Sequence, residues 1–118
     1  MSWVLAIDLG NGGPKVAAVD VSGQILATAF TPVSVHVGRD GAATQDAIEW
    51  EVALRSAVAR VIGEVAHDAL TAIGITGQWG STVPVGPDDA PAGPVLLWQD
   101  TRSRGNVSRI LGGPISVA

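Results

Sequence analysis

Apolar and polar residues fall in short alternating runs over the first third of the chain, and glycine-rich turns separate the runs. This pattern predicts three extended strands joined by tight turns, which is typical of an antiparallel meander. Pro32 lies inside the third run and cannot donate a ladder hydrogen bond, so it indicates an edge, a bend or the end of that strand. The three predicted strands cover residues 3–9, 15–21 and 24–37.

The period of the apolar residues changes in the middle of the chain. From Ala47 to Val65 they recur every three to four positions, which predicts an amphipathic helix. Asp46 precedes this segment as a candidate N-cap, and Glu49 follows three residues later, so the pair predicts a capping box.

Extended segments return after the predicted helix. Residues 69–76, 81–85 and 94–98 form apolar runs, with a turn at 77–80 and a polar loop at 86–91 between them. The predicted order is β-β-β-α-β, followed by a turn and more strand. The chain is therefore expected to have an α/β fold.

Composition excludes several classes of protein. Of the 118 residues, 47% are hydrophobic and 15% are charged, which excludes intrinsic disorder. Seven basic residues against eleven acidic ones give a net charge of −4, and no basic stretch could follow a phosphate backbone or an anionic membrane. We therefore expect no nucleic-acid partner and no membrane partner.

The absence of cysteine excludes disulfides, thiolate metal sites and cysteine nucleophiles. No run approaches the roughly 18 apolar residues of a membrane span, and the N-terminal apolar run is too short for a signal peptide. These features predict a cytoplasmic protein. The apolar stretch Ile115–Ala118 ends without a polar tail, which predicts that residues 1–118 are the N-terminal portion of a larger domain.

The strongest chemical signal is the glycine-rich segment Asp8–Lys15. Glycines let the backbone approach an anion and direct successive N–H groups at it. A carboxylate at a strand end can hold Mg²⁺ through water, and a nearby lysine can neutralise phosphate charge. Lys15 is the only lysine of the chain. The alternative is a hairpin in which Asp8 and the glycines serve turn geometry alone.

Two familiar glycine motifs do not fit this segment. The P-loop needs glycine before its lysine and Ser or Thr after it, whereas Lys15 lies between Pro14 and Val16. The dinucleotide fingerprint opens a helix, but a strand follows here, which disfavours a dinucleotide-binding oxidoreductase. A glycine turn between antiparallel strands is the arrangement of the actin-like phosphotransferases.

Three stretches in order resemble the N-terminal part of the FGGY carbohydrate kinases, the group that holds xylulokinases, gluconokinases and glycerol kinases. They are Ile7–Lys15, which looks like the first phosphate loop, Ile73–Gln78, which looks like the strand and turn that enter the sugar site, and Leu97–Arg102. Thr44–Asp46, before a helix that carries Trp50, matches more loosely. The resemblance covers nearly the whole chain.

This resemblance implies an actin-like (ribonuclease H-like) fold of two domains, with ATP and a sugar or polyol in the cleft between them. It implies a carbohydrate kinase that transfers the γ-phosphoryl of ATP to an alcohol group with the help of Mg²⁺. Asp8 is then expected near the metal, through water. The residues implied at the phosphates are Asp8, Gly10, Asn11, Gly12, Gly13 and Lys15, and those implied at the sugar are Gln78, Trp79 and Asp100.

The sequence also departs from the family. Asn11 stands where the family usually has Thr or Ser, and its amide can still donate to a phosphate oxygen. After Gln78, xylulokinases usually have Met-His and glycerol kinases Arg-Glu, whereas this chain has Trp79-Gly80. No particular sugar is therefore carried over, although Trp79 could stack on the C–H face of one.

The family places its catalytic base further along the polypeptide and its adenosine contacts in the second domain. This chain alone is therefore expected to be inactive. The alternative is a short, non-catalytic binding module with the same fold, and a homo-oligomer of the full-length enzyme also stays open. A divided domain exposes part of its core, so we expect the isolated chain to be unstable or to aggregate.

Other residues receive structural interpretations. Asp100 and Arg102 could form a local ion pair instead of a sugar contact. Three tryptophans are core candidates, two histidines are expected to be structural or exposed, and one acidic pair is expected in a solvated loop. These residues are Trp3, Trp50 and Trp98, then His36 and His67, then Asp88 and Asp89.

Overall fold

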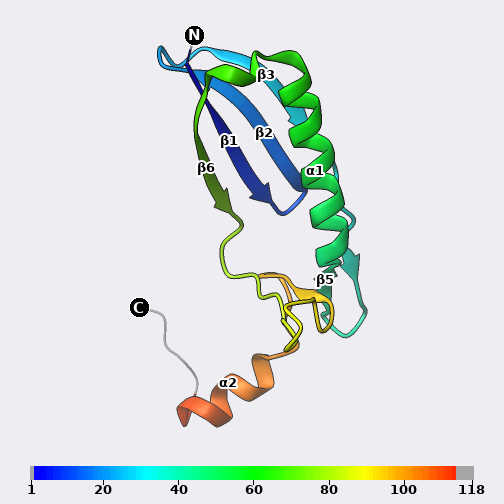
Figure 1. The fold of residues 1–118 in the computed structure, drawn as a ribbon. Helices are drawn as coiled ribbons and strands as arrows, with labels where there is room; N and C mark the ends of the chain where they lie inside the picture. The colour runs from blue at the N-terminus through cyan, green and yellow to red at the C-terminus, as the bar shows by residue number, and fades with distance from the viewer. Residues whose placement is uncertain (1, 114–118) are drawn as a thin grey trace.

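A four-stranded sheet forms the larger part of the molecule in the computed structural model, which describes residues 2–113 (Figure 1). The strand order is β3-β2-β1-β6, with the first three strands antiparallel and β6 parallel to β1. The predicted meander is confirmed, and β6 confirms the strand expected after the helix. The strands are β1 (Trp3–Gly10), β2 (Gly13–Asp20), β3 (Ile25–Phe30) and β6 (Leu70–Gly77).

Helix α1 (Ala47–Glu64) covers one face of this sheet and packs over β2 and β3. Alternate strand residues point toward it because side chains of a strand alternate between the two faces. Trp3 is 2% exposed, as predicted, and its indole N–H donates to the carbonyl oxygen of Ala66 at 2.8 Å, just beyond the helix. The core beneath α1 consists of Trp3, Leu5, Ile7, Val16, Ala18, Ala27, Ala29, Ala57 and Val61.

The N-terminus of α1 is capped as predicted, but the capping box is wrong. The carboxylate of Asp46 accepts from the backbone N–H of Ile48 at 2.8 Å. The carboxylate of Glu49 instead accepts from the backbone N–H of Ser34 at 3.1 Å. Ser34 follows the end of β3, so its N–H has no ladder partner and competes for that carboxylate.

A second, three-stranded sheet lies beyond the N-terminus of α1, with the order β4-β5-β7. Its small core consists of Ala43, Val95 and Leu97, against which Trp50 packs from the helix. Trp50 is therefore partly buried, in line with its prediction as a core residue. The strands are β4 (His36–Val37), β5 (Ala43–Gln45) and β7 (Val95–Leu96).

Three predicted strands need correction at this second sheet. The run at 24–37 divides into β3 and β4 around Pro32, and the run at 94–98 is a strand only over β7. The strand expected at 81–85 is wrong, because that segment makes only two isolated bridges, Thr82 to Leu96 and Val85 to Pro91. Its backbone has no continuous partner to form a ladder.

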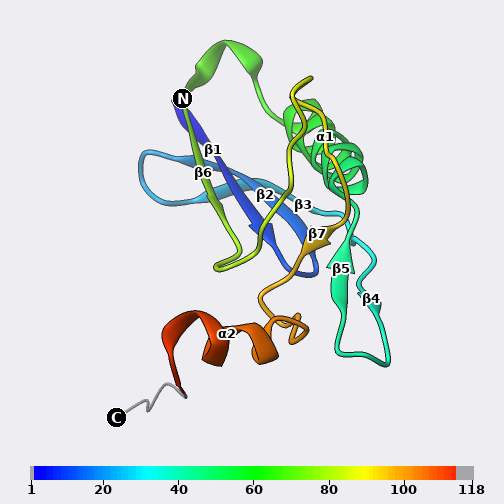
Figure 2. The ribbon, with the colours of Figure 1, turned by 90° about the horizontal axis from the view of Figure 1, so that it is seen from below.

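Two short helical elements were not predicted. A 3₁₀ turn, η1 (His67–Ala69), precedes β6, and helix α2 (Arg104–Leu111) closes the described chain and lies away from the sheet (Figure 2). Gly112, with φ of 74°, ends α2 in the left-handed conformation that glycine adopts readily. The apolar stretch Ile115–Ala118, on which the expectation of a continuing domain rests, lies outside the described residues.

The described chain is extended. Its radius of gyration is 18.2 Å, whereas a compact domain of this length has about 13 Å. Every residue of β6 is exposed, including Ile73 at 58% and Ile75 at 67%, because α1 does not reach that strand (Figure 2). Trp98 is 55% exposed, so its prediction as a core residue is wrong. Within the described residues no helix is long and apolar enough to cross a membrane.

Candidate functional site

The β1–β2 hairpin carries the glycine-rich segment. Gly10 pairs with Gly13, which leaves Asn11 and Gly12 at the tip. A side chain at Gly13 would collide with the backbone of Thr31, and its φ of +130° is strained for other residues. A Cβ at Gly12, by contrast, would meet no atom within 4 Å. The hairpin therefore presents open backbone at its tip and is packed tightly at its base.

Asp8 and Lys15 lie directly opposite each other on this hairpin. The Lys15 Nζ is 3.7 Å from the Asp8 Oδ2, and the two side chains are 68% and 44% exposed. A Cβ at Gly10 would lie 3.8 Å from each of these charged atoms, so its absence leaves room beside them. The structure thus brings together a carboxylate, an ammonium group and a glycine backbone.

A shallow groove of about 910 Å³ runs along the face of the sheet opposite α1. Asp8 and Lys15 form its polar end, and Thr76 of β6 lies beside Asp8 in the strand register. The remaining lining is mostly apolar, with Phe30 at one side.

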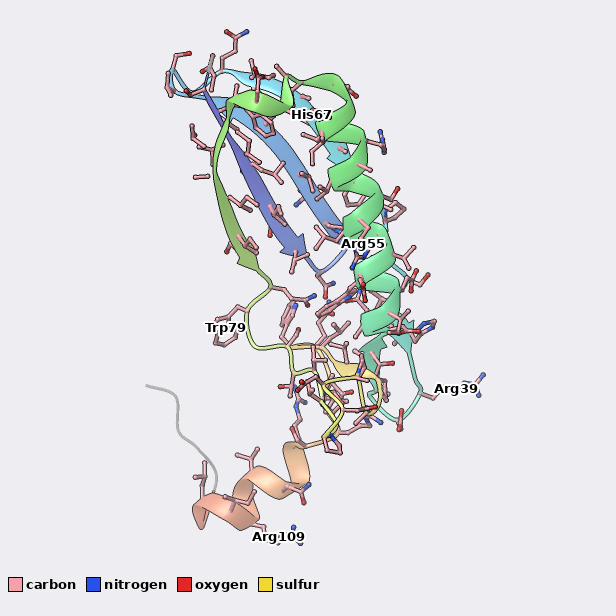
Figure 3. All side chains as sticks on the ribbon, in the orientation of Figure 1. Arg39, Arg55, His67, Trp79 and Arg109 are labelled. Carbon is pink, nitrogen blue, oxygen red and sulfur yellow. The ribbon has the colours of Figure 1, made fainter. Side chains whose placement is uncertain are left out.

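The turn after β6 reaches the same end of the sheet, because β6 is parallel to β1. The backbone N–H of Gln78 donates to the carbonyl oxygen of Leu9 at 3.0 Å, which ties the turn to the hairpin. The Gln78 Oε1 accepts from the Ser81 hydroxyl at 2.8 Å. Trp79 is 86% exposed and projects from the turn into open space (Figure 3).

Asp100 lies at the second sheet and is already engaged. Its carboxylate is 2.7 Å from the Arg102 guanidinium and accepts from the backbone N–H of Ala43 at 3.1 Å, so the predicted ion pair is present. Hydrogen bonds from Arg102, and then from the Ala43 N–H, hold the pKa of this carboxyl well below its usual range. Among the described residues, no hydrogen bond joins Asp100 to the hairpin or to Gln78.

Gln45 lies in the stretch Thr44–Asp46 that resembles the family loosely, but it was not among the predicted site residues. Its side chain is only 1% exposed and connects the hairpin, α1 and the turn after β6. A polar residue at an inward position of β5, two residues after buried Ala43, was a signal that could have found it. That signal becomes readable only once β5 is recognised as a strand.

The remaining predicted residues lie apart from this site. His36 and His67 are both exposed, and the His67 Nε2 is 2.9 Å from the carbonyl oxygen of Ile62. Asp88 and Asp89 occupy an exposed loop, where the Asp88 carboxylate accepts from the backbone N–H of Ala90. In residues 2–113 no three His, Asp or Glu side chains gather closely enough to form a metal cage.

A sheet with this strand order and a glycine hairpin at its first turn are features of the actin-like class of fold. Comparison with known proteins agrees: residues 3–113 match the model of the FGGY family of carbohydrate kinases, N-terminal domain. The chain belongs to this family. The resemblance inferred from the sequence is confirmed.

Individual relatives support the same assignment. An erythritol kinase of Brucella abortus is 34% identical over 98% of this chain and 22% of its own length. A xylulose kinase of Staphylococcus xylosus is 26% identical over 93% of this chain and 23% of its own length. The structure of a xyloylose kinase from Brucella ovis superposes with a TM-score of 0.80 at 30% identity, over 92% of this chain and 23% of that one. The chain therefore spans less than a quarter of the length of these relatives.

Proposed function

We propose that this chain supplies the phosphate-binding hairpin and one wall of the acceptor site of an ATP-dependent carbohydrate kinase. One observation carries the proposal: the Asp8–Lys15 pair and the open backbone at Gly12 lie at the same sheet end as the Gln78 turn, which Leu9 joins to the hairpin. Phosphoryl transfer needs a phosphate cradle and an acceptor site side by side.

The hairpin residues fit the phosphate end of a nucleotide. The backbone from Gly10 to Gly13 offers N–H groups without side chains in the way, and Lys15 supplies positive charge for phosphate oxygens. The Oδ1 of Asn11 is buried and has no hydrogen-bond partner within the described residues. The Asn11 side chain forms no hydrogen bond within the described residues, so its N–H₂ is available to donate to a phosphate oxygen.

Mg²⁺ fits Asp8 through water. This ion usually keeps several waters and binds one or two carboxylates together with substrate phosphates, so a half-exposed carboxylate beside the hairpin matches its needs. When bound, Mg²⁺ neutralises negative charge on the phosphates. Asp8 would orient the hydrated ion, and Lys15 would keep the Asp8 carboxylate pointing along the hairpin.

The acceptor is a small sugar or polyol in this proposal. Gln78 keeps donor and acceptor capacity beyond its contact with Ser81, which suits recognition of hydroxyl groups. The exposed ring of Trp79 could cover the C–H face of the acceptor. Asp100 stays a proposed sugar contact through lone pairs that Arg102 and Ala43 leave free.

The general base that accepts the hydroxyl proton is assigned to no residue of this chain. By the family resemblance it lies beyond residue 118, together with the adenosine contacts. The ATP-dependent activity is therefore proposed for the protein translated from the complete reading frame, which would contain the general base and the adenosine contacts together with residues 1–118.

The test is phosphoryl transfer by the protein expressed from that complete reading frame. The protein is incubated with ATP, Mg²⁺ and, in separate reactions, erythritol, xylulose, glycerol or gluconate, and the products are identified by mass spectrometry. We expect one acceptor to gain a single phosphoryl group at a rate well above the others. Failure of the protein to bind ATP, or hydrolysis of ATP without any phosphorylated acceptor, would overturn the proposal.

A further inference from the structure

Gln45 is buried where three elements meet. Its Nε2 donates to the carbonyl oxygen of Asn11, at the tip of the hairpin, at 2.7 Å. Its Oε1 accepts from the Trp50 indole N–H of α1 at 3.0 Å and lies 3.5 Å from the Nε2 of Gln78. With only 1% of its surface exposed, the side chain relies on these partners rather than on water.

The chemistry of the partners fixes the orientation of the Gln45 amide. An indole N–H can only donate and a backbone carbonyl can only accept, so the oxygen must face Trp50 and the nitrogen must face Asn11. Glutamate at this position would direct an acceptor at the Asn11 carbonyl, and methionine would offer no hydrogen bond to either partner. The site therefore requires a primary amide at this length of side chain.

This arrangement links the two loops that the proposed function uses. Asn11 belongs to the phosphate hairpin, and Gln78 belongs to the turn beside the acceptor, yet the two residues lie 67 positions apart in the chain, from 11 to 78. One buried side chain contacts both of them and attaches them to α1. A shift of either loop would break one of these buried hydrogen bonds.

We propose that Gln45 is a positioning residue that holds the phosphate hairpin at a fixed distance from the acceptor turn. This inference rests on the proposed kinase function, because its benefit is alignment of the γ-phosphoryl with the acceptor hydroxyl. A misplacement of the reacting groups by about 1 Å can lower the rate roughly 100-fold, so a rigid link between the two loops would keep the rate high. The 3.5 Å contact to Gln78 is the longest of the three.

The test compares Gln45→Met and Gln45→Glu with a core variant that lies away from the network. Val61→Ala is the control, because Val61 lies on the sheet-facing side of α1, is fully buried, and its truncation destabilises the protein through a cavity. In the protein from the complete reading frame, both Gln45 variants are expected to lower kcat/KM about 10- to 100-fold and to raise KM for both ATP and the acceptor. Val61→Ala is expected to lower the melting temperature while both KM values stay within about twofold of the original.

Amide hydrogen exchange gives a readout that does not depend on activity. The N–H of Gln78 bonds to Leu9 and the N–H of Val33 bonds to Gly12, so these amides report on the turn and on the hairpin. We expect both to exchange faster in Gln45→Met than in Val61→Ala. Equal exchange in the two variants would overturn the positioning role whatever the kinetics. If the original protein phosphorylates no acceptor, the proposed function fails, and the exchange result still decides whether Gln45 holds the loops.

Discussion

The carboxylate of Asp8 lies 3.7 Å from the ammonium group of Lys15, directly opposite it in the register of β1 and β2. The Lys15 side chain is mostly exposed and that of Asp8 is about half exposed, so the pair contributes little to stability, typically under about 1 kcal/mol. Its position in the lining of the groove fits the proposed role in binding phosphate and metal.

Asp8→Asn therefore separates function from stability. We expect it to lower kcat in the protein from the complete reading frame by about 100-fold or more, because it removes the charge that is proposed to hold the metal through water, and to leave the melting temperature nearly unchanged. Glu51→Gln is the matched control, since it also breaks an exposed ion pair, with Arg55, but lies on α1. An equal loss of activity in both variants would contradict the assignment of Asp8.

Gly12 and Gly13 are neighbours, but the fold has room for a side chain only at Gly12. Gly13→Ala forces a side chain against the Thr31 backbone at a φ of +130°, so we expect the free energy of unfolding to fall by about 2 kcal/mol or more. Gly12→Ala meets no neighbouring atom, so its stability should change by less than about 0.5 kcal/mol.

ATP affinity is the second measurement on this pair. A methyl group at Gly12 occupies the open side of the hairpin where the phosphates are proposed to lie. We therefore expect Gly12→Ala to weaken ATP binding about tenfold in a titration, while its urea unfolding curve overlays that of the original protein. Unchanged ATP affinity in Gly12→Ala would place the nucleotide elsewhere.

The lowered pKa of Asp100 predicts a pH dependence of stability. Hydrogen bonds from Arg102 and the Ala43 N–H stabilise the charged form in the folded state, so the folded pKa lies below the unfolded value of 3.8. The stability that this carboxylate contributes is then fully present above the unfolded pKa and is lost as the pH falls toward the folded pKa.

Asp100→Asn tests this dependence. The difference in urea midpoint between the original protein and the variant should be largest near neutral pH and should shrink between about pH 4 and pH 2. Ser56→Ala, on the exposed side of α1, changes no titratable group and serves as the control, so its difference in urea midpoint should stay constant with pH. A difference that stays constant with pH would show that the ion pair with Arg102 does not form in solution.

The exposed strand β6 predicts the behaviour of the isolated chain. Ile73 and Ile75 are more than half exposed and project from a sheet edge that pairs with no further strand within the described residues. Such a patch promotes association, so residues 1–118 expressed alone should elute largely as aggregate in size-exclusion chromatography. Ile75→Thr is expected to raise the monomer fraction, whereas Ser56→Thr, on the exposed side of α1, should leave it unchanged. A monodisperse original chain would contradict this prediction.

The sequence pattern predicted those elements that are determined by interactions between residues close together in the chain. The hairpin, β3, α1 and its Asp46 cap follow from alternation, helical periodicity and turn chemistry, all of which act over a few residues. The second sheet was largely missed because its strands are only two or three residues long and are held by distant partners. The predicted capping box was wrong for a related reason. The carboxylate of Glu49 accepts from the backbone N–H of Ser34, which lies 15 residues away in the chain.

The burial of the tryptophans likewise depends on distant parts of the chain and could not be predicted from local patterns. Trp3 and Trp98 both sit in apolar runs, yet Trp3 lies under α1 and Trp98 is exposed, because burial depends on which element covers a residue. The site divides in the same way: Asp8 and Lys15 are opposite each other in a predictable hairpin, whereas the contact of Gln45 with Asn11 spans 34 residues.

The most direct test of the central claim is to locate the nucleotide on the protein. Mn²⁺ replaces Mg²⁺ in complex with ATP, and its paramagnetic broadening of backbone amide resonances is recorded for the protein from the complete reading frame. We expect the strongest broadening at Asp8–Lys15 and at Thr76–Gln78, with none at the distant turn Ser22–Gly23. Broadening that is absent from the hairpin, or centred on another part of the chain, would contradict the account.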